Sequence, residues 1–257
     1  MNSGQVLRGE ITLRNSETPE RFILSKTFEH RTLSSSSPFY IPRVGVKFES
    51  IVEFPSFGET SFFRKALNER IISECTSSSK EFNSGSLREN WDLISSGVST
   101  FTRQYTYQEQ WQVRLETESV ASFAVWVAPD WGGCGNPTKW AGRNFCWREG
   151  NLNEIKLVDL FRSGTEWEEK IRRWCRADLR RRGLGRASQS LSPATSIDVF
   201  TLSPTGLQIY FNPYILGSGA DGEFVVHIPF ALLRKFLQED GVAGSIWPLQ
   251  KKEPRGA

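Results

Sequence analysis

Alternating polar and apolar residues mark several short segments near the start of the chain. The segments GQVLRGEITLR and ERFILSKTFEH flank the polar turn NSETP, and RVGVKFESIVEFP repeats the same alternation. A period of two is typical of strands with one buried face. We therefore predict three strands here, with the serine run LSSSSPF as a loop before the third.

A helical period replaces the alternation in GETSFFRKALNERIISEC, where Phe63, Leu67, Ile71 and Cys75 fall on one face. This pattern predicts an amphipathic helix laid on a sheet. The stretch from Thr76 to Asn90 carries many serines and charges. We interpret it as the helix end followed by an exposed connection.

Alternation returns in TFTRQYTYQEQWQVRLETESVASFAVWVAPDW, with a turn expected near Glu118. Two long antiparallel strands are the natural result. The tail adds a hairpin, SIDVFTLSPTGLQIYF, that turns at Pro204-Thr205-Gly206. The strand EFVVHI and the helix PFALLRKFLQED follow, with Pro229 in the first helical turn and Gly241 as the C-cap.

The segment TEWEEKIRRWCRADLRRRG predicts the clearest helix of the chain. Thr165 and Glu168 have the spacing of a capping box, and Gly183 is placed to end the helix. Its expected buried stripe comprises Trp167, Ile171, Trp174, Cys175 and Leu179.

These elements predict an α+β fold in which antiparallel sheets are packed by amphipathic helices. The chain shows no βαβ alternation with glycine-rich crossovers, which disfavours a nucleotide-binding Rossmann sheet.

Composition narrows the class of protein. With 257 residues, 38% of them hydrophobic, the chain can bury a core as one large domain or two small ones. Its net charge of +3 gives no global electrostatic reason to bind nucleic acid or an anionic membrane. No apolar stretch is long enough for a membrane span, and the start MNSGQVLRGEITLR shows no export signal.

Residues suited to catalysis are few. His30 and His227 are the only histidines, which excludes a zinc hydrolase with an H-E-x-x-H motif, and we expect no metal and no cofactor. The carboxylates Glu109, Glu116, Asp130 and Glu149 leave a glycan hydrolase with a carboxylate pair as an alternative. In that alternative Glu109 shares a strand face with Tyr107 and Trp111, whereas Glu116 lies on the polar face.

The four cysteines are too few for a fold built on disulfides, and none forms the close pair of a zinc site. We expect Cys75 and Cys175 to be buried thiols on helix stripes. Cys134 and Cys146 bracket a loop whose ends can meet. In an exported protein a disulfide between them and two free thiols are equal alternatives, whereas in a cytosolic protein we expect free thiols.

Two local features are candidates for binding. Seven arginines lie between Arg172 and Arg186, and we interpret them as a solvated helix face, with phosphate or an acidic protein surface as the alternative. The segment APDWGGCGNPTKWAGRNFCW concentrates Trp131, Trp140 and Trp147 in a glycine-rich loop. Such a loop either packs its aromatic side chains on the core or presents them as recognition anchors, and we favour recognition.

The C-terminal part of the chain resembles a known family. It contains EIKLVDLF, an amphipathic helix, and then VFTLSPTGLQIYFNPYILGSGADGEFVVHIPFALLRKFL. This order resembles the domain shared by the lysozyme-sensing anti-sigma factor RsiV and the peptidoglycan deacetylase PdaC, and it covers roughly Asn153 to Glu239. The preceding region resembles the companion domain more weakly. Where family members carry a histidine-containing glycine turn, this chain has Gly132-Gly133-Cys134-Gly135 without the histidine.

The resemblance implies a boundary between residues 1–154, a strand-rich companion domain with one helix, and residues 155–257. It also implies a non-enzymatic binding module that captures a lysozyme-like cell-wall hydrolase or a toxin, with peptidoglycan or glycan binding as an alternative. An extracytoplasmic site of action would follow, although the missing export signal leaves the cytoplasm open. The family's contact residues cannot be carried over. We assign partner binding to Trp131, Trp140, Trp147, Asn144, Tyr214 and Asp221.

Overall fold

The computed structural model describes residues 6–11, 20–25, 28–41, 44–95, 104–130 and 138–247. The strands are β1 (Val6–Ile11), β2 (Glu20–Ser25), β3 (Phe28–Ile41), β4 (Val44–Phe57), β5 (Gln104–Glu116), β6 (Val120–Asp130), β7 (Lys139–Arg148), β8 (Asn151–Glu154), β9 (Phe200–Ser203), β10 (Gly206–Phe211) and β11 (Phe224–Pro229). The α-helices are α1 (Phe62–Ser95), α2 (Trp167–Arg181), α3 (Gly185–Ser190), α4 (Phe230–Leu233) and α5 (Val242–Ile246). Short 3-10 turns occur at η1 (Leu157–Leu160), η2 (Gly219–Asp221) and η3 (Arg234–Phe236).

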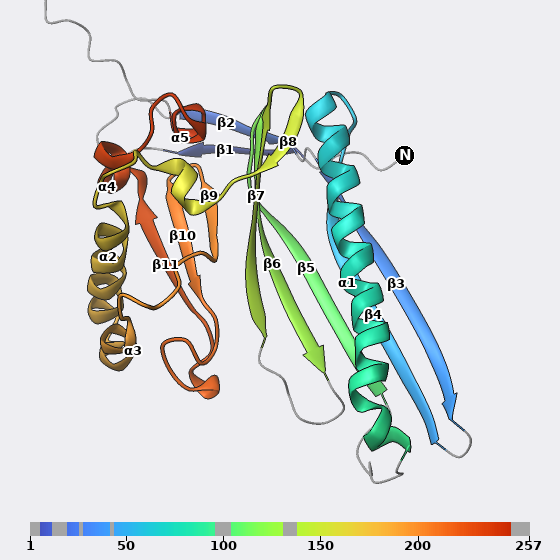
Figure 1. The fold of residues 1–257 in the computed structure, drawn as a ribbon. Coiled ribbons are helices and arrows are strands. Elements are labelled where there is room, and N and C mark those ends of the chain that lie inside the picture. The colour runs from blue at the N-terminus through green and yellow to red at the C-terminus, as the bar shows by residue number, and fades with distance from the viewer. Residues whose placement is uncertain are drawn as a thin grey trace, which may run out of the picture.

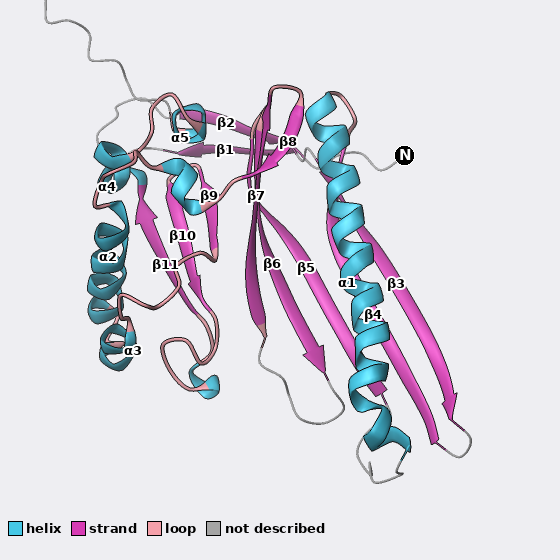
Figure 2. Ribbon diagram, viewed as in Figure 1, coloured by secondary structure: helices cyan, strands magenta, loops and turns pink. Residues whose placement is uncertain are grey.

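The described strands form a six-stranded sheet in the order β3-β4-β5-β6-β7-β8, a three-stranded sheet in the order β11-β10-β9, and the hairpin β1-β2. Helix α1 lies along one face of the large sheet, and the small sheet packs against the other face through β9 (Figure 1). Helix α2 covers the outer side of the small sheet (Figure 2). The predicted α+β class is confirmed.

The large sheet departs from the prediction at one strand pair. β4 and β5 run parallel, with Glu53 opposite Gln110, whereas the other neighbours in both sheets are antiparallel. A parallel pair needs a long crossover, and α1 provides one of 34 residues. The expectation of purely antiparallel sheets is therefore wrong at this pair.

Helix α1 is much longer than predicted. Its buried stripe continues past Cys75 through Ser79 and Phe82, which are four and seven residues further along. The Ser79 hydroxyl lies 2.5 Å from that of Ser50 on β4, and the Phe82 ring packs at 5.2 Å from Tyr107. The predicted connection from Thr76 to Asn90 is therefore helix, because a buried serine continues the stripe without adding hydrophobicity.

Two other predicted loops are strands. The serine run lies within β3, where Ser34 pairs with Ile51 and Ser37 with Phe48. β3 ends the order of the large sheet, and small polar residues suit a strand at an edge. Most of the second half of the tryptophan-rich segment forms β7, paired with β6 from Lys139 to Cys146.

The helix ends also differ from the prediction in detail. Gly183 ends α2 with φ +78°, as expected. The capping box is absent: Glu166 is the N-cap without a side-chain bond, and the Thr165 hydroxyl donates to the Arg162 carbonyl. Gly241 precedes α5 as its N-cap, so its predicted role as a C-cap is wrong.

Two arginines of α2 are tied to the protein, whereas Arg173, Arg180 and Arg181 are exposed as the solvated-face interpretation expects. Arg172 is buried and donates to the carbonyls of Ser192 and Thr195, and it also pairs with Glu168 at 2.7 Å. Arg176 donates to the Leu191 carbonyl at 3.1 Å. The interpretation as a solvated face is wrong for these side chains, which hold the segment after α3 against α2.

Two hydrophobic clusters form the core. One lies between α1 and the large sheet, around Leu67, Ile71 and Phe123. The other fills the space between α2, the small sheet and one end of the large sheet. The second cluster includes Leu115 and Val120, which precede the proposed boundary, so the division at residue 155 stays a prediction.

Candidate functional site

The structure separates the tryptophans that the sequence grouped in one loop. Trp140 and Trp147 lie seven residues apart on β7 and so face opposite sides of the sheet. Trp140 packs on Tyr210 of the small sheet, with ring centroids 5.4 Å apart. Trp147 packs against the cluster under α1. Trp131 lies outside the described residues.

Asn144 joins the two sheets from a buried position, with 2% of the residue exposed. Its Oδ1 accepts a hydrogen bond from Ser122 at 2.6 Å, and its Nδ2 donates to the Phe200 carbonyl at 2.9 Å. The Ser122 hydroxyl accepts the Leu202 amide at 2.8 Å. The Asn144 amide is therefore used within the protein, and its contact with a partner stays a prediction.

Tyr214 and Asp221 lie together in the connection between β10 and β11, at the end of the small sheet next to Trp140. Asn212 fastens this connection to the edge of β7. Its Oδ1 accepts from the Trp140 amide at 2.7 Å, and its Nδ2 donates to the Trp140 carbonyl at 2.9 Å. The pair of bonds fixes where the connection leaves the sheet.

The connection between β10 and β11 also has contacts between its own residues. Asp221 accepts the amide and hydroxyl of Ser218, each at 2.7 Å, and these bonds lower the pKa of Asp221 below its ordinary value. The Tyr214 hydroxyl lies over Gly219, where an added Cβ would be only 2.3 Å from it. The segment is therefore held in one shape by short-range bonds.

Two large side chains of this connection project into solvent. Tyr214 is 68% exposed and Ile215 is 49% exposed. Tyr214 also has φ +70°, a left-handed conformation that is uncommon for an aromatic residue. A strained, exposed aromatic residue on a closed segment is a physical reason to suspect function. We call Tyr214 and Ile215, together with the half-buried Trp140, the exposed aromatic surface.

A second group of side chains crosses the face of the large sheet that is opposite α1. Gln110 donates to Glu53 at 3.0 Å and accepts from Gln112 at 3.3 Å, and Arg114 donates to Gln112 at 2.9 Å. We call Glu53, Gln110, Gln112 and Arg114 the polar ladder. Sequence reasoning missed it, although alternating glutamines in QYTYQEQWQVR were a visible signal.

A β-bulge at Arg114 ends the polar ladder. The side chains of β5 beyond it point to the opposite faces from those that a regular alternation would give. Val113 pairs with Phe123, but Leu115 pairs with Ser122, so Arg114 is the extra residue. Leu115 therefore joins the cluster beneath the small sheet. Glu116 faces α1, and its predicted place on the polar face is wrong.

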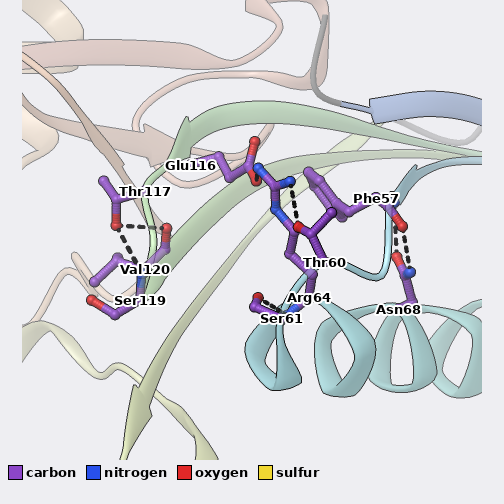
Figure 3. Close-up of polar contacts among 9 residues, drawn as sticks. All are labelled: Phe57, Thr60, Ser61, Arg64, Asn68, Glu116, Thr117, Ser119 and Val120. Carbon is purple, nitrogen blue, oxygen red and sulfur yellow. Dashed lines mark hydrogen bonds and ion pairs between the residues drawn. The ribbon is translucent and has the colours of Figure 1, made fainter.

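Glu116 and Arg64 connect β5 with the first turn of α1 (Figure 3). The Arg64 guanidinium lies 2.6 Å from the Glu116 carboxylate and also donates to Thr60 at 3.2 Å. Asn68, one turn further along, bonds the amide and carbonyl of Phe57 at 2.9 and 2.8 Å. These contacts position α1 on the sheet, which is a structural task for Glu116.

Glu109 is buried between β5 and α1, on the same strand face as Tyr107 and Trp111, as predicted. It accepts hydrogen bonds from the Tyr107 hydroxyl, from the Trp111 Nε1 at 2.5 Å and from the Cys75 thiol at 3.9 Å. Burial, and next the Glu109 charge, raise the pKa values of Tyr107 and Cys75. Glu109 therefore organises a polar site inside the core.

The four candidate carboxylates do not converge on one site. Glu109 pairs with Val127, three residues from Asp130, so Glu109 and Asp130 face opposite sides of the sheet. Glu116 is paired with Arg64, and Glu149 is exposed in the turn after β7. The geometry gives no support to a hydrolase that uses a pair of these residues.

The cysteines behave largely as buried thiols. Cys75, Cys146 and Cys175 are free and buried, and burial raises the pKa of Cys175 to about 12. Cys134 lies outside the described residues. The alternative disulfide with Cys134 therefore finds no support, because Cys146 is free.

Neither a metal site nor a membrane helix is present in the described part of the chain. No group of three or more His, Cys, Asp or Glu side chains there is arranged to hold a metal ion. No described helix has both the length and the hydropathy that crossing a membrane requires.

The C-terminal part of the chain matches one protein-family model. Residues 158–231 match the family described as "Protein of unknown function (DUF3298)". No curated protein matches the chain at a significant level.

Two solved structures share the fold of nearly the whole chain. A DUF3298 family member from Bacteroides fragilis NCTC 9343 is similar over 85% of this chain and 96% of its own, with a TM-score of 0.59 and 14% identity. A DUF3298 family protein from Pseudomonas aeruginosa PAO1 is similar over 87% of this chain and 97% of its own, with a TM-score of 0.58 and 13% identity. The chain thus carries a DUF3298 match at residues 158–231 and has the overall fold of solved DUF3298 proteins.

Proposed function

We propose that this protein is a non-enzymatic binding module that captures another protein through the exposed aromatic surface. The proposal rests on the observation that large exposed side chains lie on a segment whose position is fixed. Tyr214 and Ile215 are 68% and 49% exposed on a segment that is fixed by the two Asn212 bonds to Trp140. Anchors that are ordered before binding lose less conformational entropy when a partner docks.

The chemistry of the surface suits a protein partner. Large aromatic and branched side chains dominate the binding energy of protein interfaces. Asp221 and Glu223 are exposed at the rim of the same connection, which favours a partner with basic residues around an apolar pocket. Trp140 lies half-buried behind the loop and supports it from β7.

The class of partner comes from the resemblance to RsiV and PdaC. We propose a lysozyme-like cell-wall hydrolase, or a toxin of that kind, as the captured protein. The scattered positions of Glu109, Glu116, Asp130 and Glu149 are consistent with a module that has no hydrolytic activity of its own.

The test is calorimetric titration of the chain against a panel of lysozymes of different structural types. We expect saturable binding to at least one of them. Tyr214→Ala and Ile215→Ala should each weaken that binding by about 30-fold, the equivalent of about 2 kcal/mol for a central anchor.

Phe62→Ala is the matched control, because Phe62 is 82% exposed at the start of α1 and belongs to a different part of the surface. Its affinity should equal that of the unaltered protein. Absence of binding across the panel would overturn the partner class, and full affinity in both loop variants would overturn the proposed surface.

A further inference from the structure

We infer that β3 is the pairing edge of a homodimer, in which two copies of this chain join their large sheets through antiparallel β3 strands centred on His30. The inference goes beyond the proposed capture of a protein and does not depend on it. β3 ends one side of the large sheet, whereas Trp140 of the exposed aromatic surface lies on β7, near the other side (Figure 1). Pairing at β3 therefore leaves Tyr214 and Ile215 exposed.

Side chains cover the edges of the small sheet. On the outer edge of β11, the Val225 carbonyl accepts a hydrogen bond from Arg182 at 2.8 Å. The His227 carbonyl on the same edge accepts one from Trp174 Nε1 at 3.1 Å. Side chains of the large sheet bond the outward backbone groups of β9. Covering an edge in this way keeps its backbone groups from pairing with the strand of another molecule.

The edge of the large sheet at β3 is long and uncovered. β3 has 14 residues, whereas β8 at the opposite edge has four. The side chains from Glu29 to Thr32 are all exposed, as is Ser34. Among the described residues, β3 pairs with β4 alone, and nothing bonds the backbone of residues 29–34 from the outer side. This edge can therefore be extended by another strand.

Two prolines show which backbone groups of β3 point outward. In an antiparallel pair of strands, opposite residues alternate between pairs that exchange two hydrogen bonds and pairs that exchange none. Pro38 lies opposite Lys47, and Pro55 lies opposite His30. Because proline has no N–H, both are pairs without hydrogen bonds, and each contains an even-numbered residue of β3. The N–H and C=O groups of His30 and Thr32 therefore point away from β4.

The charges of β3 favour a second copy of the chain as the occupant. In an antiparallel pair of β3 strands centred on His30, Glu29 of each copy lies opposite Arg31 of the other, so the ion pair forms twice. These residues point their own backbone groups to β4, and in such positions opposite side chains approach each other most closely. Neither side chain has an ion-pair partner within the described part of the chain.

Neighbouring registers lack this complementarity. A strand pair centred on Arg31 places the two guanidinium groups opposite each other, which is destabilising. A pair centred on Thr32 places Arg31 opposite Leu33 and leaves its charge unmatched. The charges therefore select the register centred on His30, with Phe28 opposite Thr32 at each end.

The experiment is sedimentation equilibrium of the full chain over a range of concentrations, and we expect a monomer–dimer equilibrium. Thr32→Pro removes an outward N–H without removing a bond to β4. It should weaken the dimer by about 30-fold or more, because the symmetric pair loses two hydrogen bonds. Thr32→Ala is the matched control, since it removes the same exposed side chain and keeps the N–H. It should dimerise like the unaltered protein.

A charge exchange tests the register without changing the backbone. Glu29→Arg places two pairs of like charges opposite each other and should weaken the dimer by about 10-fold. The double variant Glu29→Arg/Arg31→Glu exchanges the two charges and should restore the dimer to within about 3-fold of the unaltered protein. These variants remain informative even if the proline lowers stability.

Three results would overturn the inference. These are a protein that stays monomeric at every concentration, a Thr32→Pro dimer as strong as that of Thr32→Ala, or a double charge variant as weak as Glu29→Arg alone. Lysozyme binding by Thr32→Pro should equal that of the unaltered protein, because β3 is remote from Tyr214. Failure of the dimer is therefore separable from failure of protein capture.

Discussion

The two faces of the large sheet are held by different means. Under α1, a continuous stripe including Phe63, Leu67 and Ile71 buries apolar surface along the helix. On the opposite face, one end of the large sheet shares an apolar cluster with the small sheet through Leu115, Val120 and Cys146. Further along β7, the two sheets are joined by single polar and backbone contacts at Gly142 and Asn144. A stripe spreads its stabilisation over many residues, whereas a junction of few contacts is sensitive to each one.

Gly142 gives the largest expected effect, because the small sheet touches its Cα directly. An added Cβ would lie 1.8 Å from the Phe200 carbonyl oxygen and 2.8 Å from its carbon. These are backbone atoms that cannot rotate away, so Gly142→Ala should lower the free energy of unfolding by about 3 kcal/mol or more. Urea denaturation measures this loss.

Gly58→Ala is the matched control, because nothing lies within 4 Å of a Cβ added there. Its stability should change by about 0.5 kcal/mol or less. If Gly142→Ala were as stable as Gly58→Ala, the small sheet would be able to move and accept the added Cβ. The proposed difference between the two faces of the large sheet would then be wrong.

Asn144 comes next, since its amide is the polar bond between the sheets. Asn144→Ala leaves the Ser122 hydroxyl and the Phe200 carbonyl without this partner in a buried place. We expect the free energy of unfolding to fall by about 2 kcal/mol. Asn153→Ala, which removes an exposed amide from β8, should change it by less than about 0.5 kcal/mol. Equal losses in the two variants would contradict a special role for the buried amide.

Arg64 and Glu116 test the α1 face, where a single polar contact should matter less. Their side chains are 24% and 9% exposed, so solvent screens the ion pair only partly. A double-mutant cycle with Arg64→Met and Glu116→Gln should give a coupling free energy of about 1 kcal/mol. A coupling free energy larger than the one between Asn144 and Ser122 would show that single polar contacts matter more on the α1 face, which contradicts the comparison.

The same difference explains what the sequence could predict. The stripe under α1, the pair β5–β6, the hairpin β9–β10 and the helix α2 all follow hydrophobic periods, and each was confirmed. A period reports which face of an element is buried, because that face must be apolar. The period does not show which other helix or strand packs against that buried face.

The failures occur where one residue decides the geometry. The bulge at Arg114 moved Glu116 to the other face of β5, and no period contains an inserted residue. Ser79 carries the α1 stripe without being apolar, so the helix seemed to end early. Of the proposed exposed aromatic surface, Trp140 and Tyr214 were candidates from the sequence and Ile215 was not. The anchoring contact between Asn212 and Trp140 joins residues 72 apart in sequence, which no local pattern indicates.

Tyr214 gives the smallest expected effect on stability, and it separates strain from binding. Its φ of +70° costs a residue with a Cβ about 1 kcal/mol, which glycine does not pay in the folded state. Glycine also gains entropy in the unfolded chain, which offsets part of this advantage. Tyr214→Gly should therefore be more stable than Tyr214→Ala by about 0.5 kcal/mol, as measured by urea denaturation, while both variants lose partner binding. If Tyr214→Ala were the more stable of the two, the left-handed backbone would not be a source of strain, and the exposed side chain alone would have to justify the proposed surface.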